Sequence, residues 1–458
     1  MNSWRACVET VCVAALALVV LGMGPAAGQD AEATAAELQG PYELSPSEVA
    51  RMAMERNPSV RAQAESIAEA MAQLQQAEAM KGLQVNLQAS AIRMGPVVSL
   101  QLPEEMGGDA IELGVDHIEQ AAISLMKPLY TGKRAELAAG MARDGIEAAT
   151  WGQGAARRAV ALAAQELAYT ALRTDQLAVV TAARVTAIAE HVKIAEALRD
   201  EGLVAEFDVV QAQTELSRAQ GDLIEAQTAV AQMEAAIRNI IAVPQTTEIS
   251  LEDGVPPAEP EGELPELIEA AWGQRPEVEA AEAAVRIAQM NVRLAAASLN
   301  LTVALTGQYG RQAEASGLSS QYSWQIGLVV EKPLYDGGLR SGKVREAQAQ
   351  LRAASLNLES VKHEVALQVT QHFLSVAEAR ARIETAQQGL TEARERRRMA
   401  QLRYREGIAA GIEVIDADTA VAAAEATMVN AEYDLQLATV RLRSAVGIVE
   451  DVEEVEGQ

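Results

Sequence analysis

Apolar residues recur every seven positions over long stretches of the chain. Two series follow this period: Val209, Leu216, Leu223, Val230 and Ile237, then Val414, Val421, Met428, Leu435 and Leu442. Most positions three residues further along hold alanine. A strict seven-residue period indicates a left-handed coiled coil, and alanine in its seam lets neighbouring backbones approach closely. The pattern predicts tightly packed helical hairpins.

The lengths of the helical patterns predict a rod. Uninterrupted patterns cover 134–199 and 340–405, about 66 residues each, which corresponds to ~100 Å of helix. Patterns of roughly half that length cover 46–80, 206–241, 265–297 and 412–446. Two half-length helices laid end to end match one long helix. Each half of the chain is therefore expected to be a rod with strands at one end and a glycine turn at the other.

Two pairs of short segments alternate between apolar and polar residues instead, near 83–127 and near 299–332. An ordinary hairpin on a soluble core is one explanation. Strands of ~10 residues, in an otherwise helical chain whose first 28 residues have the pattern of an export signal, favour a membrane β-barrel, with Tyr309, Tyr322 and Trp324 as its interfacial girdle. Four strands are too few to close a barrel, so several copies must contribute; physics alone allows two, three or four.

The amino terminus predicts export. Residues 1–28 hold Arg5, an apolar stretch and a small-residue end, the pattern of a secretory signal. The apolar stretch is shorter than the ~20 residues of a membrane-spanning helix, which disfavours an anchored first helix. Cys7 and Cys12 both lie inside this segment. The mature chain is therefore expected to lack disulfides, cysteine metal sites and a lipid anchor.

Two phrases repeat at one offset. Lys127-Pro-Leu-Tyr-Thr-Gly132 returns as Lys332-Pro-Leu-Tyr-Asp-Gly337 (332 − 127 = 205), and Glu201-Gly-Leu-Val-Ala205 returns as Glu406-Gly-Ile-Ala-Ala410 (406 − 201 = 205). A shared offset indicates a tandem duplication. We expect a first repeat at 41–243, a Pro- and Gly-rich linker at 244–262, a second repeat at 263–448 and an acidic disordered tail at 449–458.

Composition argues against other classes of function. The net charge of −26 repels nucleic acid, and aromatic residues make up only 3% of the chain. The four histidines, His117, His191, His363 and His372, lack metalloprotease spacing, and surface positions explain His363 and His372. Gly152-Gln-Gly154 is an incomplete phosphate loop. No enzyme activity, cofactor or metal is expected.

The chain resembles the TolC-like outer-membrane efflux proteins. The resemblance rests on the two repeated phrases together with Phe207-Asp-Val-Val-Gln-Ala212 and Ile412-Glu-Val-Ile-Asp-Ala417. It implies a mainly α-helical fold with a small β part, in which each chain of a homotrimer gives four strands to a 12-stranded barrel and its helices to a periplasmic tunnel. The implied partners are outer-membrane lipid, a periplasmic adaptor protein and an inner-membrane pump.

The resemblance also implies roles for individual residues. The adaptor-docking tips would be Gly202, Leu203, Val204, Ala205, Gly407, Ile408, Ala409 and Ala410, with the two glycines at positive φ. The strand-to-helix junctions would be Pro128, Gly132, Pro333 and Gly337.

The gate residues come from the same resemblance. Glu413 and Asp416 would form an acidic constriction, although two carboxylates three residues apart on a helix also suit a solvated face. Tyr404 and Asp208 would share a hydrogen bond that ties the closed tip. A basic partner found in some members is missing, because Ala409 and Ala410 occupy that region.

The expected function is the outer-membrane channel of a tripartite export system. A type I protein secretion duct is an alternative within the same class. A periplasmic structural coiled coil is an alternative from another class, but it leaves the amphipathic strands unexplained. The transported substrate is not encoded in any visible motif.

Overall fold

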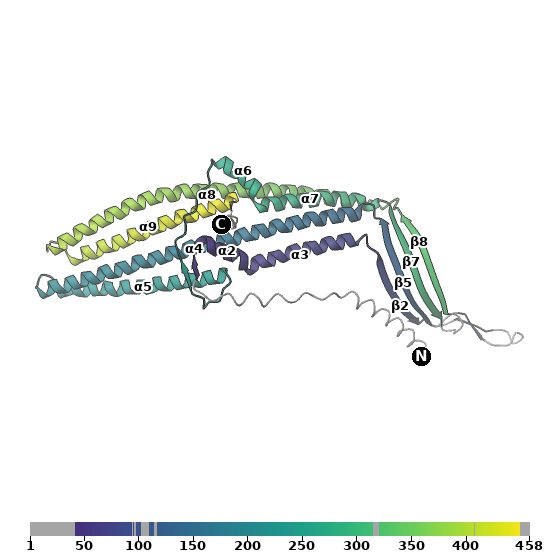
Figure 1. The fold of residues 1–458 in the computed structure, drawn as a ribbon, viewed down its shortest axis with the longest axis horizontal. Helices are drawn as coiled ribbons and strands as arrows, with labels where there is room; N and C mark the ends of the chain where they lie inside the picture. Colours follow the sequence, from purple (N-terminus) through teal and green to yellow (C-terminus); the bar gives the residue numbers. More distant parts are fainter. Residues whose placement is uncertain are drawn as a thin grey trace, which may run out of the picture.

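The computed structural model describes residues 42–93, 95, 98–101, 110–113, 117–314, 320–406 and 408–448. The expected signal segment 1–28, Gly407 and the acidic segment 449–458 lie outside these ranges. Figure 1 shows a long rod of helices with a small sheet at one end, set at an angle to the rod. The expected mainly helical fold with a small β part is confirmed.

Four helices build the rod at the end away from the sheet. They are α4 (Arg134–Asp200), α5 (Glu206–Ile240), α8 (Leu339–Arg405) and α9 (Gly411–Val446). The two long helices have 67 residues each, as the uninterrupted patterns predicted. Their starts are 205 residues apart (339 − 134 = 205), and so are those of α5 and α9 (411 − 206 = 205).

The half-length patterns that precede the strands are each divided into two helices, which differs from the expected single helices. The bounds are α2 (Pro46–Arg56), α3 (Pro58–Ala79), α6 (Leu264–Gln274) and α7 (Pro276–Ala296). Each break falls at the residue before a proline, where the backbone of Asn57 and of Arg275 is extended. Proline lacks the N–H that the helix needs and disfavours helical backbone in the preceding residue.

The helices form a wall with two free edges. Helix α4 packs against α3 and α5, and α7 and α9 each pack against both α4 and α8. The order is therefore α3-α4-α7-α8 toward the sheet and α5-α4-α9-α8 toward the far end. Alanine fills much of the interior, as the seam pattern predicted. None of the helices described is long and apolar enough to cross a membrane.

A small unit flanks the middle of the rod. Strands β1 (Tyr42–Leu44) and β6 (Ile249–Leu251) pair in parallel beside α2. Val49, Ala53, Ile237 and Ile241 are buried in the core beneath them. Strand β6 falls inside the segment that composition marked as a linker, and neither three-residue strand was predicted.

The sheet contains four antiparallel strands in the order β2-β5-β7-β8. Their bounds are β2 (Gln84–Arg93), β5 (His117–Tyr130), β7 (Thr302–Glu314) and β8 (Ser320–Glu331). A separate pair, β3 (Val98–Gln101) with β4 (Ala110–Leu113), was not predicted. Within the described strands, β2 and β8 each lack a partner on their outer edge.

The register divides the sheet into an apolar and a polar face. One cross-strand row reads Leu87, Ile123, Tyr309 and Trp324, all of them exposed or partly exposed. The adjacent row on the other face reads Asn86, Ser124, Gln308 and Gln325, whose last two amides share a hydrogen bond of 2.8 Å. The strand pairing thus converts the alternating pattern into two chemically different surfaces.

The sheet joins the long helices through the repeated Pro-Leu-Tyr-x-Gly phrase. Gly132 and Gly337 both have positive φ, +66° and +65°. The variable position caps the helix in each copy. The Thr131 hydroxyl accepts a bond from the N–H of Ala135, and the Asp336 carboxylate accepts bonds from two N–H groups at the start of α8. Pro128 lies at a bulge in β5, and Pro333 directly follows β8.

Candidate gate at the helical tip

Both helical hairpins turn at the end of the rod opposite the sheet (Figure 1). Helix α4 ends in a Schellman motif, in which the N–H of Gly202 bonds to Arg199 O and that of Leu203 bonds to Leu198 O, each at 2.8 Å. The φ of Gly202 is +76°, so the expected helix-ending glycine is found at this turn. Its backbone reverses where a β-carbon would be strained.

The second turn closes with a comparable bond. The N–H of Ile408 bonds to Arg403 O at 2.9 Å, which spans the same five residues as the bond from Leu203 to Leu198. Ala410 is the N-cap residue of α9. Gly407 was expected to have positive φ, but it lies outside the described residues.

The tips present apolar side chains to solvent. Leu203 and Ile408 are largely exposed, whereas Val204 packs inward against Tyr404 and its neighbours. Phe207, one of only two phenylalanines in the chain, is 73% exposed on the first turn of α5. The family phrase that contains Phe207 gives this residue no role; its exposure at a helix start is the structural signal for one.

Tyr404 and Asp208 do not share a hydrogen bond in this structure. Tyr404 is buried, and its hydroxyl has no hydrogen-bond partner among the residues described. The Asp208 carboxylate instead accepts a bond from the N–H of Ala205 at 3.2 Å, which caps α5. Burial, and then the charge of Asp208, raises the pKa of the Tyr404 hydroxyl. The expected latch bond therefore stays a prediction for the assembled protein.

The two candidate constriction carboxylates have different surroundings. Glu413 forms an ion pair with Arg403 of α8, with Nη1 and Oε2 3.1 Å apart. Asp416 is exposed, and within the described ranges no ion pair is found for it. Arg403 was missed by sequence analysis because it precedes the turn while Glu413 follows it. Helix packing brings this basic group against Glu413 across the turn.

Buried polar residues lie just inside the tip. His191 of α4 is 5% exposed and contacts the ring of Tyr404, with centroids 5.2 Å apart. Burial lowers the pKa of His191. Asp418 of α9 is also 5% exposed, and its Oδ1 has no hydrogen-bond partner in the described structure. Burial raises the pKa of Asp418, and the charge of Arg397 partly offsets this. Neither residue was singled out from the sequence.

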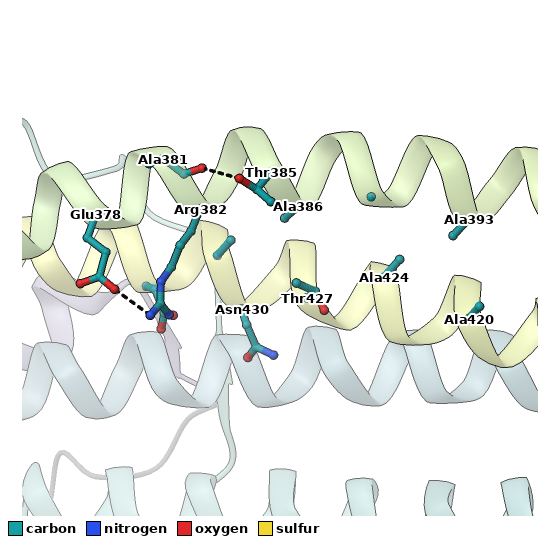
Figure 2. Close-up of a pocket in the computed structure, with 13 residues that line it drawn as sticks. Glu378, Ala381, Arg382, Thr385, Ala386, Ala393, Ala420, Ala424, Thr427 and Asn430 are labelled. Atoms are coloured by element: carbon teal, nitrogen blue, oxygen red, sulfur yellow. Dashed lines mark hydrogen bonds and ion pairs between the residues drawn. The ribbon is translucent and has the colours of Figure 1, made fainter.

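A groove runs between α8 and α9 behind the tip, with a volume of about 690 Å³. Figure 2 shows its lining of small side chains, with the ion pair of Glu378 and Arg382 at one end. The groove residues Ala420, Ala424, Thr427 and Ala431 follow Asp416 at steps of three or four residues. Residues so spaced share a helix face, so the groove continues the surface that carries Asp416.

The paired-helix rod, the two-faced sheet and the exposed tips match outer-membrane export channels in fold. VceC, an outer-membrane protein of Vibrio cholerae, has a solved structure that aligns with 89% of this chain and 97% of its own, at a TM-score of 0.71 and 18% identity. A model of the outer membrane efflux protein family matches residues 49–243 and 267–448. The chain belongs to this family, which confirms the resemblance drawn from its motifs.

Individual relatives are similar over parts of their length. The outer membrane efflux protein BepC of Brucella suis is 26% identical over 285 residues, covering 59% of each chain. TolC of Escherichia coli is 26% identical over 145 residues, covering 32% of this chain and 29% of TolC. The chain thus spans less than two thirds of the length of these relatives. Its place is the outer membrane, with a periplasmic helical tunnel, as expected.

Proposed function

We propose that the protein is the outer-membrane channel of a tripartite export system, a passive duct rather than an enzyme. Three copies would give four strands each to a barrel of 3 × 4 = 12 strands. The observation that carries this proposal is the two-faced sheet, in which the described strands leave both outer edges unpaired. Hydrocarbon does not tolerate open strand edges, and closed membrane barrels need at least ~8 strands.

The helical wall supports closure by the same repetition. Its free edges are α8 on one side and α3 with α5 on the other, and the sheet ends in β8 and β2 in the same order. A neighbouring copy would cover the free edge of the helical wall and the free edge of the sheet at once. The apolar sheet face would then meet outer-membrane lipid, while the polar face and the Asp416 face of α9 would line the duct.

Mass and location test the assembly. We expect the mature protein in the outer-membrane fraction, with a protein mass in detergent of three chains after subtraction of bound detergent. A soluble single chain in the periplasmic fraction would contradict both the barrel and the duct. It would favour the periplasmic structural coiled coil.

We propose further that the second tip holds the constriction. The ion pair with Arg403 offsets the charge of Glu413, so Asp416 supplies most of the negative potential along the axis. In planar-bilayer recordings Asp416→Ala should reduce cation preference more than Glu413→Ala. Arg403→Gln should increase it, because Glu413 would lose its counter-charge. Unchanged selectivity in all three variants would show that this face does not line the pore.

The exposed apolar tips are the proposed docking surface for a periplasmic adaptor, which would link the duct to an inner-membrane pump. Phe207 is the largest side chain on this surface and joins the expected set that includes Leu203 and Ile408. Phe207→Ser should weaken adaptor crosslinking without changing barrel insertion, because the side chain is largely exposed and its removal should destabilise the fold little. Full crosslinking by this variant would place the adaptor elsewhere.

The duct wall offers little basis for choosing a substrate. The groove of Figure 2 is lined mainly by alanine, glycine and threonine, apart from its charged end. Small neutral side chains give neither a charge filter nor a shaped binding site. We therefore assign the choice of cargo to the pump.

A further inference from the structure

The two hairpins meet at one imidazole near the tip. His191 belongs to the α4–α5 hairpin, and it contacts Tyr404 of α8, whose side chain is 4% exposed. Gly411, the first residue of α9, is buried beside both. A β-carbon on Gly411 would lie 3.6 Å from His191 Nε2 and 3.7 Å from Tyr404 Oη. A single side chain of one hairpin thus reaches both helices of the other.

The residues around this contact are largely aliphatic. One cluster packs Ala400, Val414 and Ala417 against Leu198, and a second packs Val192 against Ile415. Such contacts hold two helices together equally well at any pH. His191 is different because it can change its charge between about pH 5 and pH 8.

Among the described residues, neither Tyr404 nor Asp208 links the two hairpins at the tip by a side-chain hydrogen bond. The Tyr404 hydroxyl has no partner in the described part of the chain, and the Asp208 carboxylate is engaged by the N–H of Ala205. The aromatic ring of Tyr404, rather than its hydroxyl, therefore joins the hairpins. Its partner in that contact is His191.

We propose that His191 is the latch of the tip: its neutral imidazole, packed on Tyr404 and Gly411, holds the hairpins together, and its protonation releases them. The inference rests on the proposed function, in which the tip is the closed end of a duct. It adds to that function one gating residue, His191, and one trigger, the protonation of its imidazole.

The direction of the pH dependence follows from the burial of His191. Desolvation favours neutral His191, so its pKa in the packed tip is below the ordinary value. In an open tip the exposed imidazole would recover its ordinary pKa of about 6.5. The open state then binds protons more readily. The latch is fully present above the ordinary pKa and is lost as the pH falls through the lowered value.

The charged groups that face His191 from other helices do not reverse this pH dependence. On α5, Asp208 is bonded to backbone, and on α8 the pKa of Tyr404 is raised, so its hydroxyl stays neutral. Arg397, also on α8, adds positive charge near Asp418, and Arg403 is paired with Glu413. On α4 itself, Glu190 and Lys193 form an exposed pair.

Asp418 of α9 acts in the opposite direction. Its pKa is raised by burial, so the packed tip binds its proton more readily than an open tip would. Acid therefore favours the closed state through Asp418 and the open state through His191. Asp418→Asn removes the opposing contribution and should make opening by acid more complete.

Single-channel recordings in planar bilayers, taken from about pH 8 to about pH 5, test the latch. The wild type should open on acidification, with about tenfold more open channels for each unit by which burial lowers the His191 pKa. His191→Phe keeps an aromatic ring but cannot be protonated, so it should stay closed throughout. His191→Ala loses the contact and should be open at every pH.

One variant serves as the control. His363→Phe changes an exposed histidine of α8. It should open on acidification like the wild type. Opening of His191→Phe by acid would overturn the latch and leave the duct standing. A complete lack of conductance in every variant at every pH would contradict the proposed function itself.

Discussion

The two ends of the rod depart from the usual arrangement of side chains in opposite directions. At the sheet, large apolar residues face outward, and Trp324 is 75% exposed. At the tip, polar residues are enclosed: His191, Tyr404 and Asp418 are each only 4–5% exposed. The sheet end exposes apolar side chains, while the tip end buries titratable side chains.

The difference has a physical reason at each end. Outward apolar residues are favourable when the surrounding medium is lipid, so the sheet end loses nothing by its arrangement. Within the described residues, Tyr404 Oη and Asp418 Oδ1 are enclosed polar atoms without partners, and each destabilises the packed state by roughly 1–3 kcal/mol. If the tip is the gate, as we propose, a small change in free energy should open it, whereas the sheet end should persist.

The largest effect is expected from a charge on the apolar sheet face. Ile326→Arg places a cation where we assign lipid, at a penalty of about 2–4 kcal/mol per chain near the bilayer midplane. Barrel insertion should fall sharply, measured as protein in the outer-membrane fraction.

The neighbouring residue provides the control, because Gln325 lies on the polar face of the same strand. Gln325→Arg should insert like the wild type. If both variants insert equally well, the two faces do not meet different media, and the contrast between the ends of the rod fails.

A smaller effect should distinguish the two junction glycines. Gly132 and Gly337 share a positive φ, so alanine strains either backbone by about 1–3 kcal/mol. At Gly132 the new β-carbon would also lie 2.6 Å from Asn300 Cβ, whereas nothing lies within 4 Å at Gly337. Gly132→Ala should therefore lower the thermal unfolding midpoint more than Gly337→Ala. Equal losses would show that only the backbone strain matters.

The regular elements were predictable because each follows a period visible in a single stretch of chain. The ends of α4 and α8 agree with the prediction to within about one residue. The breaks before Pro58 and Pro276 were also visible in the sequence but were not used. Strands β1 and β6 could not be predicted, because three residues are too few to show an alternation.

In the candidate gate, the sequence predicted only those features that depend on a single turn of the chain. Gly202 ends α4 at positive φ, and this follows from local chemistry. The ion pair of Arg403 with Glu413 and the contact of His191 with Tyr404 join different helices. Such contacts depend on how the helices pack lengthwise, which the seven-residue period leaves undetermined among several registers.

The smallest predicted effect concerns the Tyr404 hydroxyl. Tyr404→Phe removes a buried oxygen that has no hydrogen-bond partner in the described structure but keeps the ring against His191. We expect an unchanged closed fraction in bilayer recordings and a thermal stability equal to the wild type or higher by about 1 kcal/mol.

Tyr404→Ala is the matched variant that also removes the ring. It should open the duct, because the contact with His191 goes with it. If Tyr404→Phe opened the duct as much as Tyr404→Ala, the hydroxyl would have to bond Asp208 when the duct is closed. The ordinary tyrosine–aspartate latch would then replace the imidazole contact, and the enclosed polar groups of the tip would be better satisfied than they are in the arrangement described here.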